Sequence, residues 1–210
     1  MTKLSPGMFL MLISLQLLLV LVLVPGEWTE NVIEREAVKI QRYLGADSQT
    51  WVHETAQGWY DTTMIDSGVY KAMHRHVIPS PDERAASRGM ENLGNTIFAW
   101  AEDRLGAMMR VVYQVYARVA MATLWAPYIL ILLVPAVFDG MMRWKIKQTN
   151  FDYASPVVSR YGVRGVYIII QCALIAFVLP VALNPIIVPI GMMLAALMVG
   201  FSMANYQKRI

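Results

Sequence analysis

The sequence predicts an all-α polytopic membrane protein, with four transmembrane helices and a long helical extracytoplasmic region between spans one and two. Hydrophobic residues make up 57% of the 210 residues and charged residues only 16%, whereas a soluble domain is about 45–50% apolar and about 25% charged. Several uncharged stretches are long enough to cross a bilayer. A polar stretch with helical periodicity separates the first of them from the others.

The first predicted span covers residues 8–24 and ends at Pro25-Gly26, a pair that stops a helix at the membrane surface. Lys3 precedes it, so the segment also has the form of a cleaved signal peptide. We favour an uncleaved anchor over residues 1–26, because the apolar core exceeds the usual length of about 7–15 residues and no A-x-A-like site follows it.

Residues 27–118 have the periodicity of helices rather than of strands. Apolar positions recur at intervals of three to five residues, with charged side chains between them. Glycine and proline mark where the helices end. The predicted helices are Trp28–Leu44, closed by Gly45; a second through Trp51 and Trp59; a third piece over 67–77; and a fourth stripe from Leu93 to Val119 that runs directly into span two.

Residues 119–210 form the predicted three-span membrane domain. Span two, 119–138, is uncharged but contains Pro127 and Pro135. Each proline removes a backbone donor, so we expect a kinked helix with neighbouring helices that satisfy the freed carbonyls.

The stretch 165–207 carries no charged residue. As one helix it would be about twice as long as the hydrocarbon core is thick, so it must fold back. Asn184-Pro185 is its strongest turn signal. The sequence therefore predicts a helical hairpin with spans over 165–183 and 186–203.

Basic side chains set the predicted orientation. They occur before span one, in a basic loop at 140–164, and at the end of the chain. With four spans these three segments lie on one side, which the positive-inside rule makes cytoplasmic. Both termini are then cytoplasmic, and residues 27–118 lie on the opposite side.

No pattern in the sequence indicates an enzyme. It contains no Walker loop, G-x-S-x-G, H-E-x-x-H or C-x-x-C motif. His53, His74 and His76 lack cysteine or acidic partners at ligand spacing, so we favour structural or solvated histidines over a metal site. We therefore expect no catalytic residue, no cofactor and no metal. A single cysteine also excludes a disulfide-rich secreted scaffold.

Asp139 is the acidic residue closest to a span, and an ionisable group in a membrane is a functional candidate. Arg143 follows it by four residues, which places both side chains on one face of a helix. We therefore favour an interfacial ion pair between the two.

Small residues repeat every four positions in span four, at Ala196, Gly200 and Ala204. Such a stripe lets membrane helices approach closely. It indicates packing against another span of this chain or, as the alternative, an interface with another membrane protein or a second copy.

The basic loop contains Phe151-Asp152-Tyr153-Ala154-Ser155-Pro156, after Arg143-Trp144-Lys145-Ile146-Lys147. An aromatic-x-Tyr-Ala-Ser-Pro element in such a loop, before a terminal hydrophobic hairpin, resembles the integrating conjugative element membrane proteins. This family, of unknown molecular function, occurs on conjugative plasmids and integrating elements of Gram-negative bacteria. The order of anchor, outer region and three spans is also similar. The outer region offers no residue-by-residue match.

The resemblance implies a bacterial inner-membrane protein of conjugative DNA transfer and its type IV secretion machinery. It implies other conjugation-machinery membrane proteins as partners, the coupling ATPase among them. Because the sequence contains no catalytic motif, we expect a non-enzymatic accessory or scaffold. Direct nucleic-acid binding is not expected, because five basic residues beside a lipid bilayer do not make a nucleic-acid fold.

The candidate partner contacts are Phe151, Tyr153, Ser155 and Pro156. Ala-Ser-Pro would break a helix and present the two aromatic side chains. The alternative is that Phe151 and Tyr153 are anchors at the level of the lipid headgroups.

A small oligomeric membrane channel or transporter is the rival function. It would need polar groups along a path, and the polar residues of the spans are too few and too scattered for a pore within one chain. An oligomer built around span four would be required.

Overall fold

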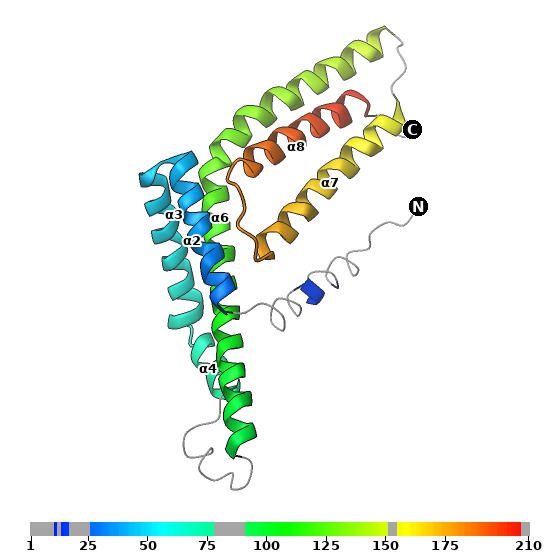
Figure 1. Ribbon diagram of the computed structural model, residues 1–210. Coiled ribbons are helices and arrows are strands. Elements are labelled where there is room, and N and C mark those ends of the chain that lie inside the picture. Colours follow the sequence, from blue (N-terminus) through cyan, green and yellow to red (C-terminus); the bar gives the residue numbers. More distant parts are fainter. Residues whose placement is uncertain (1–10, 12–13, 17–25, 78–90, 151–154, 207–210) are drawn as a thin grey trace. The chain divides into compact units, whose positions relative to one another are not determined.

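The computed structural model describes residues 11, 14–16, 26–77, 91–150 and 155–206, and all of its regular structure there is helical (Figure 1). This confirms the predicted all-α class. In chain order the helices are α2 (Gly26–Leu44), α3 (Ala46–Tyr60), the π-helix η1 (Asp61–Asp66), α4 (Val69–Val77), α6 (Glu91–Thr149), α7 (Pro156–Val178) and α8 (Ile187–Ala204).

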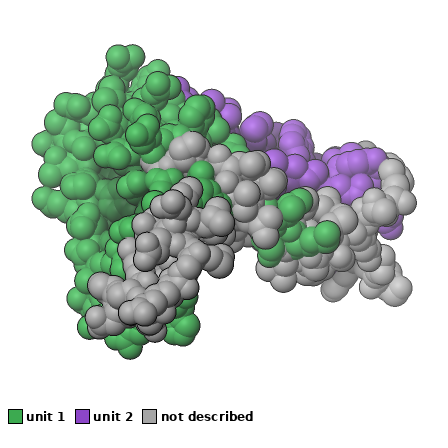
Figure 2. Space-filling model, turned by 60° about the horizontal axis from the view of Figure 1, so that its bottom comes forward, with its two compact units in different colours: residues 1–120, 177–183 green, residues 121–176, 184–210 purple. Residues whose placement is uncertain are grey.

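The chain divides into two compact units (Figure 2). Unit 1 consists of residues 1–120 together with the short segment 177–183. Unit 2 consists of residues 121–176 and 184–210. The segment between α7 and α8 is therefore shared, and most of it belongs to the unit that contains the outer region.

Unit 1 is built from α2, α3, η1, α4 and the first half of α6. Gly45 has a φ of 91° between α2 and α3, where the sequence predicts a helix end. The third predicted piece, 67–77, begins too early, because Gly68 has a φ of 76° and α4 starts at Val69. Both conformations lie in the left-handed region that glycine adopts without strain. The core contains Val32 and Ile40 of α2, Val52 and Ala56 of α3, and Leu105, Ala107, Met109, Val111 and Ala120 of α6.

The predicted outer stripe and span two are one continuous helix, α6, which extends beyond span two to Thr149. The expected loop over 140–164 is therefore mostly helical. Its first half lies in α6 and its second half in α7, which leaves only a short connection between them. The physical reason is that residues 141–149 contain no proline or glycine, and Pro156 is favoured at the first position of a new helix.

Three of the described helices are long and apolar enough to cross a membrane: Ala99–Thr149 within α6, Pro156–Val178 and Ile187–Ala204. They correspond to predicted spans two, three and four. Span one, at 8–24, lies almost wholly outside the described residues.

The third predicted span, 165–183, is wrong in its boundaries, because α7 begins at Pro156 and ends at Val178. Pro180 has no backbone N–H and restricts the residue before it, so the helix ends two residues earlier. The turn consequently extends over residues 179–186, and Asn184-Pro185 forms only its last part.

Candidate functional site

A buried ion pair joins α2 to α6 in unit 1. Arg118 Nε lies 2.8 Å from Glu36 Oε1, and the two side chains are only 1% and 7% exposed. A second guanidinium nitrogen lies 3.3 Å from Glu36 Oε2, so the contact is bidentate. A bidentate arginine–carboxylate contact is the strongest geometry for such a pair and fixes the orientation of both side chains.

The remaining donors of Arg118 bind backbone carbonyls. One terminal nitrogen donates to the carbonyls of Phe177 at 3.0 Å and Leu179 at 2.7 Å, and the other donates to Val181 at 2.7 Å. With the two bonds to Glu36, all five N–H groups of the guanidinium are used. Arg118 therefore supplies donors to the last turn of α7 and the chain after it, where carbonyls lack intrahelical partners.

Both carboxylate oxygens of Glu36 also accept hydrogen bonds from groups other than Arg118. Its Oε1 also accepts a hydrogen bond from the backbone N–H of Leu183 at 3.2 Å, and its Oε2 accepts one from Gln114 Nε2 at 3.0 Å. A buried carboxylate is tolerated only when its lone pairs are satisfied and its charge is balanced. Both conditions hold here.

Two further side chains of α2 reach the same segment. Trp28 Nε1 donates to the carbonyl of Pro180 at 3.0 Å, and Lys39 Nζ donates to the carbonyl of Ala182 at 2.6 Å. Every carbonyl from residue 179 to 182 thus accepts a hydrogen bond from a side chain of α2 or α6. We call this arrangement the clamp; it comprises segment 177–183 with Trp28, Glu36, Lys39, Gln114 and Arg118.

The clamp holds a chain segment through side-chain hydrogen bonds to its backbone. Both oxygens of Glu36 and all five N–H groups of Arg118 are occupied by one another, by Gln114 and by the backbone. The described residues contain no group of three His, Cys, Asp or Glu that could hold a metal ion. The arrangement supplies hydrogen-bond donors to the carbonyl groups of a non-helical segment that lies between two apolar helices in the sequence.

Sequence reasoning missed the clamp. The buried side chains of α2 are Thr29, Val32, Glu36 and Ile40, so two polar residues lie on its inner face. Trp28, which the apolar pattern included, is 56% exposed. The available signal was that Glu36 lies four residues from both Val32 and Ile40, and therefore on the same face of a helix.

The predicted ion pair is present in unit 2. Arg143 Nε lies 2.8 Å from Asp139 Oδ2 across one turn of α6, and the side chains are 62% and 60% exposed. An exposed pair of this kind contributes at most about 1 kcal/mol.

The predicted small-residue stripe lies against other helices of the same chain. Ala196 and Ala204 are buried, and a Cβ atom added to Gly200 would lie 3.1 Å from the carbonyl oxygen of Ala136 in α6. On α6, a Cβ added to Gly140 would lie 2.7 Å from the carbonyl oxygen of Gly200. These backbones approach as closely as glycine allows, so Gly200 packs inside unit 2.

The candidate partner contacts in the connection before α7 are only partly described. Phe151 and Tyr153 lie outside the described residues. Pro156 begins α7, and Ser155 Oγ accepts a hydrogen bond from the backbone N–H of Val158 at 3.4 Å. Ser155 therefore has the position of a helix N-cap.

Asn205 joins the ends of three helices in unit 2, and sequence reasoning missed it. Its Oδ1 accepts hydrogen bonds from Lys147 Nζ at 2.8 Å and from the backbone N–H of Ser155 at 3.3 Å. Its Nδ2 donates to the carbonyl of Phe201 at 3.0 Å. Nearby, Trp144 Nε1 donates to the carbonyl of Tyr206 at 2.7 Å.

The histidines have ordinary structural partners. His53 Nδ1 lies 2.6 Å from the hydroxyl of Tyr113, and His76 Nδ1 lies 2.8 Å from the carbonyl of Ala72 in its own helix. His74 contacts the ring of Tyr70.

Burial, followed by the neighbouring Tyr70 and Asp61, raises the pKa of Tyr60, which therefore remains a neutral phenol at physiological pH.

Comparison with known proteins gives one result. No curated protein and no solved structure matches the chain. A family model does match it over residues 23–209, which include the outer region, the clamp and all three apolar helices; its description is IncC plasmid conjugative DNA transfer protein DtrJ-like. This agrees with the conjugative part of the resemblance found in the sequence. The chain belongs to the DtrJ-like family of IncC plasmid conjugative DNA transfer proteins.

Proposed function

We propose that this protein is a non-enzymatic scaffold of the conjugative DNA transfer machinery, located in the bacterial inner membrane beside the type IV secretion apparatus. The family match supplies the process, and the clamp is the observation that carries the scaffold role. A scaffold must present a defined outer surface from a membrane anchor. The clamp holds the segment between α7 and α8 to helices of the outer region through hydrogen bonds of Arg118 and Glu36 with four backbone groups.

The clamp agrees with one feature of the proposed topology, namely that the outer region and the turn between spans three and four lie on the same side of the membrane. With both termini cytoplasmic, residues 27–118 and the turn between spans three and four lie on the periplasmic side. Residues 177–183 lie in that turn, and they share unit 1 with the outer region. A three-span arrangement with residues 27–118 on the cytoplasmic side would also place them together, so span one decides the side.

The fully hydrogen-bonded carboxylate of Glu36 favours a holding role over proton transfer. A buried carboxylate in a relay needs an open oxygen and a path for the proton. Each oxygen of Glu36 instead accepts two hydrogen bonds. This supports the scaffold over a proton-coupled transporter.

The proposed partners are other membrane proteins of the conjugation machinery, with the coupling ATPase among them. Phe151, Tyr153, Ser155 and Pro156 remain the proposed contact surface. Support comes from the fixed helix ends on either side of it, since Ser155 is bonded to Asn205 and so is Lys147 near the end of α6. Helix ends that are already held in place lower the entropic cost of binding a partner beside them.

The test is crosslinking and affinity purification from membranes of donor cells that carry the conjugative element, with a tag at the C-terminus. We expect the coupling ATPase or secretion-channel subunits to co-purify. Recovery of the protein alone as a defined oligomer, with ion flux in reconstituted vesicles, would contradict the scaffold and indicate a channel.

Tyr153→Ala/Ser155→Ala tests the contact surface in the same cells. We expect a lower transfer frequency and less co-purified partner at an unchanged membrane level, because both the aromatic side chain and the helix cap are removed. Tyr43→Ala/Ser48→Ala removes the same groups from the outer region and is the matched control. Equal transfer by the two variants would exclude the loop as a working surface.

A further inference from the structure

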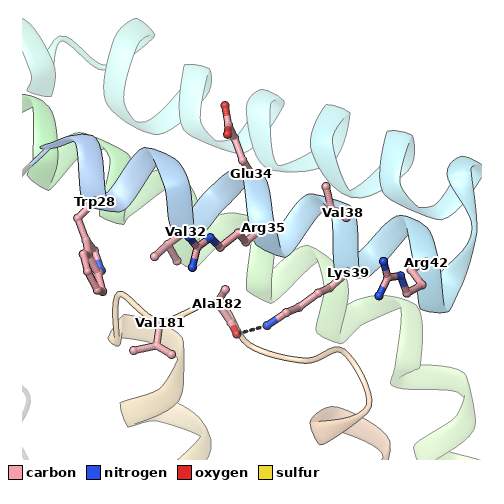
Figure 3. A pocket seen from close by; sticks show the side chains of 9 residues that line it. All are labelled: Trp28, Val32, Glu34, Arg35, Val38, Lys39, Arg42, Val181 and Ala182. Atoms are coloured by element: carbon pink, nitrogen blue, oxygen red, sulfur yellow. Dashed lines mark hydrogen bonds between the residues drawn. The ribbon is translucent and has the colours of Figure 1, made fainter.

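A groove runs along one side of α2 in unit 1, beside the segment after α7 (Figure 3). Its volume is about 590 Å³. Arg35, Lys39 and Arg42 line it from α2, and Val181 and Ala182 line it from the segment. The three cations are spaced by four and three residues, which places them on one face of the helix.

The charged residues that line this groove are predominantly basic. Glu34 is the one acidic residue among the described residues that line it, and its side chain points away from Val181 and Ala182 (Figure 3). Within the described parts of the chain, neither Arg35 nor Arg42 forms an ion pair with a carboxylate. Lys39 differs, because it donates to the carbonyl of Ala182. Among the described residues, these two guanidinium groups therefore have no anionic partner.

The lining between the cations is apolar. Val32 and Val38 contribute from α2, Val181 contributes from the segment, and the ring of Trp28 closes one end. The indole N–H of Trp28 is fixed by its hydrogen bond to Pro180, while the side chain as a whole is 56% exposed. A tryptophan whose ring is partly exposed to solvent and partly packed against apolar side chains is typical of the interface between membrane and water.

The groove is lined in part by the segment that connects α7 and α8. Val181 and Ala182 lie three and four residues after the end of α7, and α8 begins at Ile187. Both helices are long and apolar enough to cross a membrane. If they do so, the segment between them lies at the membrane surface, and so does the groove that it lines.

We propose that this groove binds the headgroup of an anionic membrane phospholipid. The phosphate pairs with Arg35 and Arg42, and the apolar lining receives the start of an acyl chain. An arginine fork matches phosphate oxygens in geometry as well as in charge. The inference rests on the membrane location proposed above, and it is independent of the proposed protein partners.

The test uses the full chain purified in a nonionic detergent and titrated with phosphatidylglycerol or phosphatidylcholine, with bound lipid counted by native mass spectrometry. Arg35→Gln/Arg42→Gln should weaken phosphatidylglycerol binding on the order of ten-fold and leave phosphatidylcholine binding unchanged. Lys71→Gln/Arg75→Gln on α4 removes the same net charge from exposed positions and should retain full affinity. Arg35→Lys/Arg42→Lys should recover most of the binding.

Three results would overturn the inference. Equal affinity for the two lipids in the unmodified protein is the first, and unchanged phosphatidylglycerol affinity in Arg35→Gln/Arg42→Gln is the second. The third is full displacement of the lipid by inorganic phosphate, which would indicate a site for a free anion. Thermal unfolding followed by circular dichroism separates lost binding from lost folding. Absence of the protein from the membrane fraction of cells would instead contradict the proposed location.

Discussion

The clamp of unit 1 and the helix contacts of unit 2 stabilise neighbouring parts of the chain by different chemistry. In the clamp, long polar side chains supply hydrogen bonds to backbone that is not helical. In unit 2, α8 meets its neighbours through glycines, where Gly140 lies against Gly200 and Gly162 lies against the carbonyl of Met198. The first region uses charge and the second uses close backbone approach.

The difference follows from what the backbone needs. A continuous helix satisfies its own N–H and C=O groups, so neighbouring helices need only shape complementarity, which small residues provide. An irregular segment between two apolar helices leaves carbonyls without donors, and each such group is costly away from water. Arg118 donates to three of these carbonyls with a single side chain, at the cost of a buried charge that Glu36 must balance.

The largest expected effect is in the clamp. Arg118→Met leaves Glu36 buried without its cation and removes the donors to Phe177 and Val181, so it should lower the free energy of unfolding by about 3–5 kcal/mol. Unfolding of the detergent-solubilised protein by denaturant measures this loss. Arg75→Met on the exposed face of α4 makes the same chemical change and should have little effect. Equal losses in the two variants would show that the clamp contributes nothing to stability.

Gly140→Ala should have an intermediate effect in unit 2. The added methyl group would lie 2.7 Å from the carbonyl oxygen of Gly200 and 2.8 Å from Met203 Cβ, so α6 and α8 must separate, at a cost of about 1–3 kcal/mol. The matched control is Gly191→Ala on α8, where a Cβ meets nothing within 4 Å. There alanine should stabilise the helix by up to about 1 kcal/mol. The same sign for both variants would contradict the packing argument.

Asn205→Ala should have the smallest effect of the three. It removes the acceptor shared by Lys147 Nζ and the backbone N–H of Ser155, but the lysine retains access to water. We expect a loss of about 1 kcal/mol in the free energy of unfolding. Asn150→Ala, at an exposed position just after α6, is the control. A loss as large as that of Arg118→Met would show that the two regions are equally dependent on polar contacts.

Much of the fold was predictable, because its signals are local. Gly45 was predicted to end the first outer helix, and the structure gives it a positive φ angle between α2 and α3. The three uncharged stretches predicted as spans two, three and four each lie largely within a helix that is long and apolar enough to cross a membrane. Span three was predicted to continue to the Asn184-Pro185 turn, but α7 ends at Val178, because Pro180 restricts the residue before it.

The candidate site was less predictable than the helices. Asp139 and Arg143 could be paired from the sequence because they are four residues apart on one helix. Glu36 and Arg118 are separated by 82 residues. No periodicity indicates which of several acidic residues in the outer region faces which arginine, because that choice depends on how α2 and α6 pack together.

The sequence by itself determined the all-helical class, the order of the helices and the three long apolar segments. Helix formation and helix termination depend on neighbouring residues, and uncharged length is a property of the chain alone. Only the tertiary structure decided that Glu36, Gln114 and Arg118 are buried together around residues 177–183. A buried charge is tolerated only where partners from distant segments converge on it, and such convergence exists only in the folded chain.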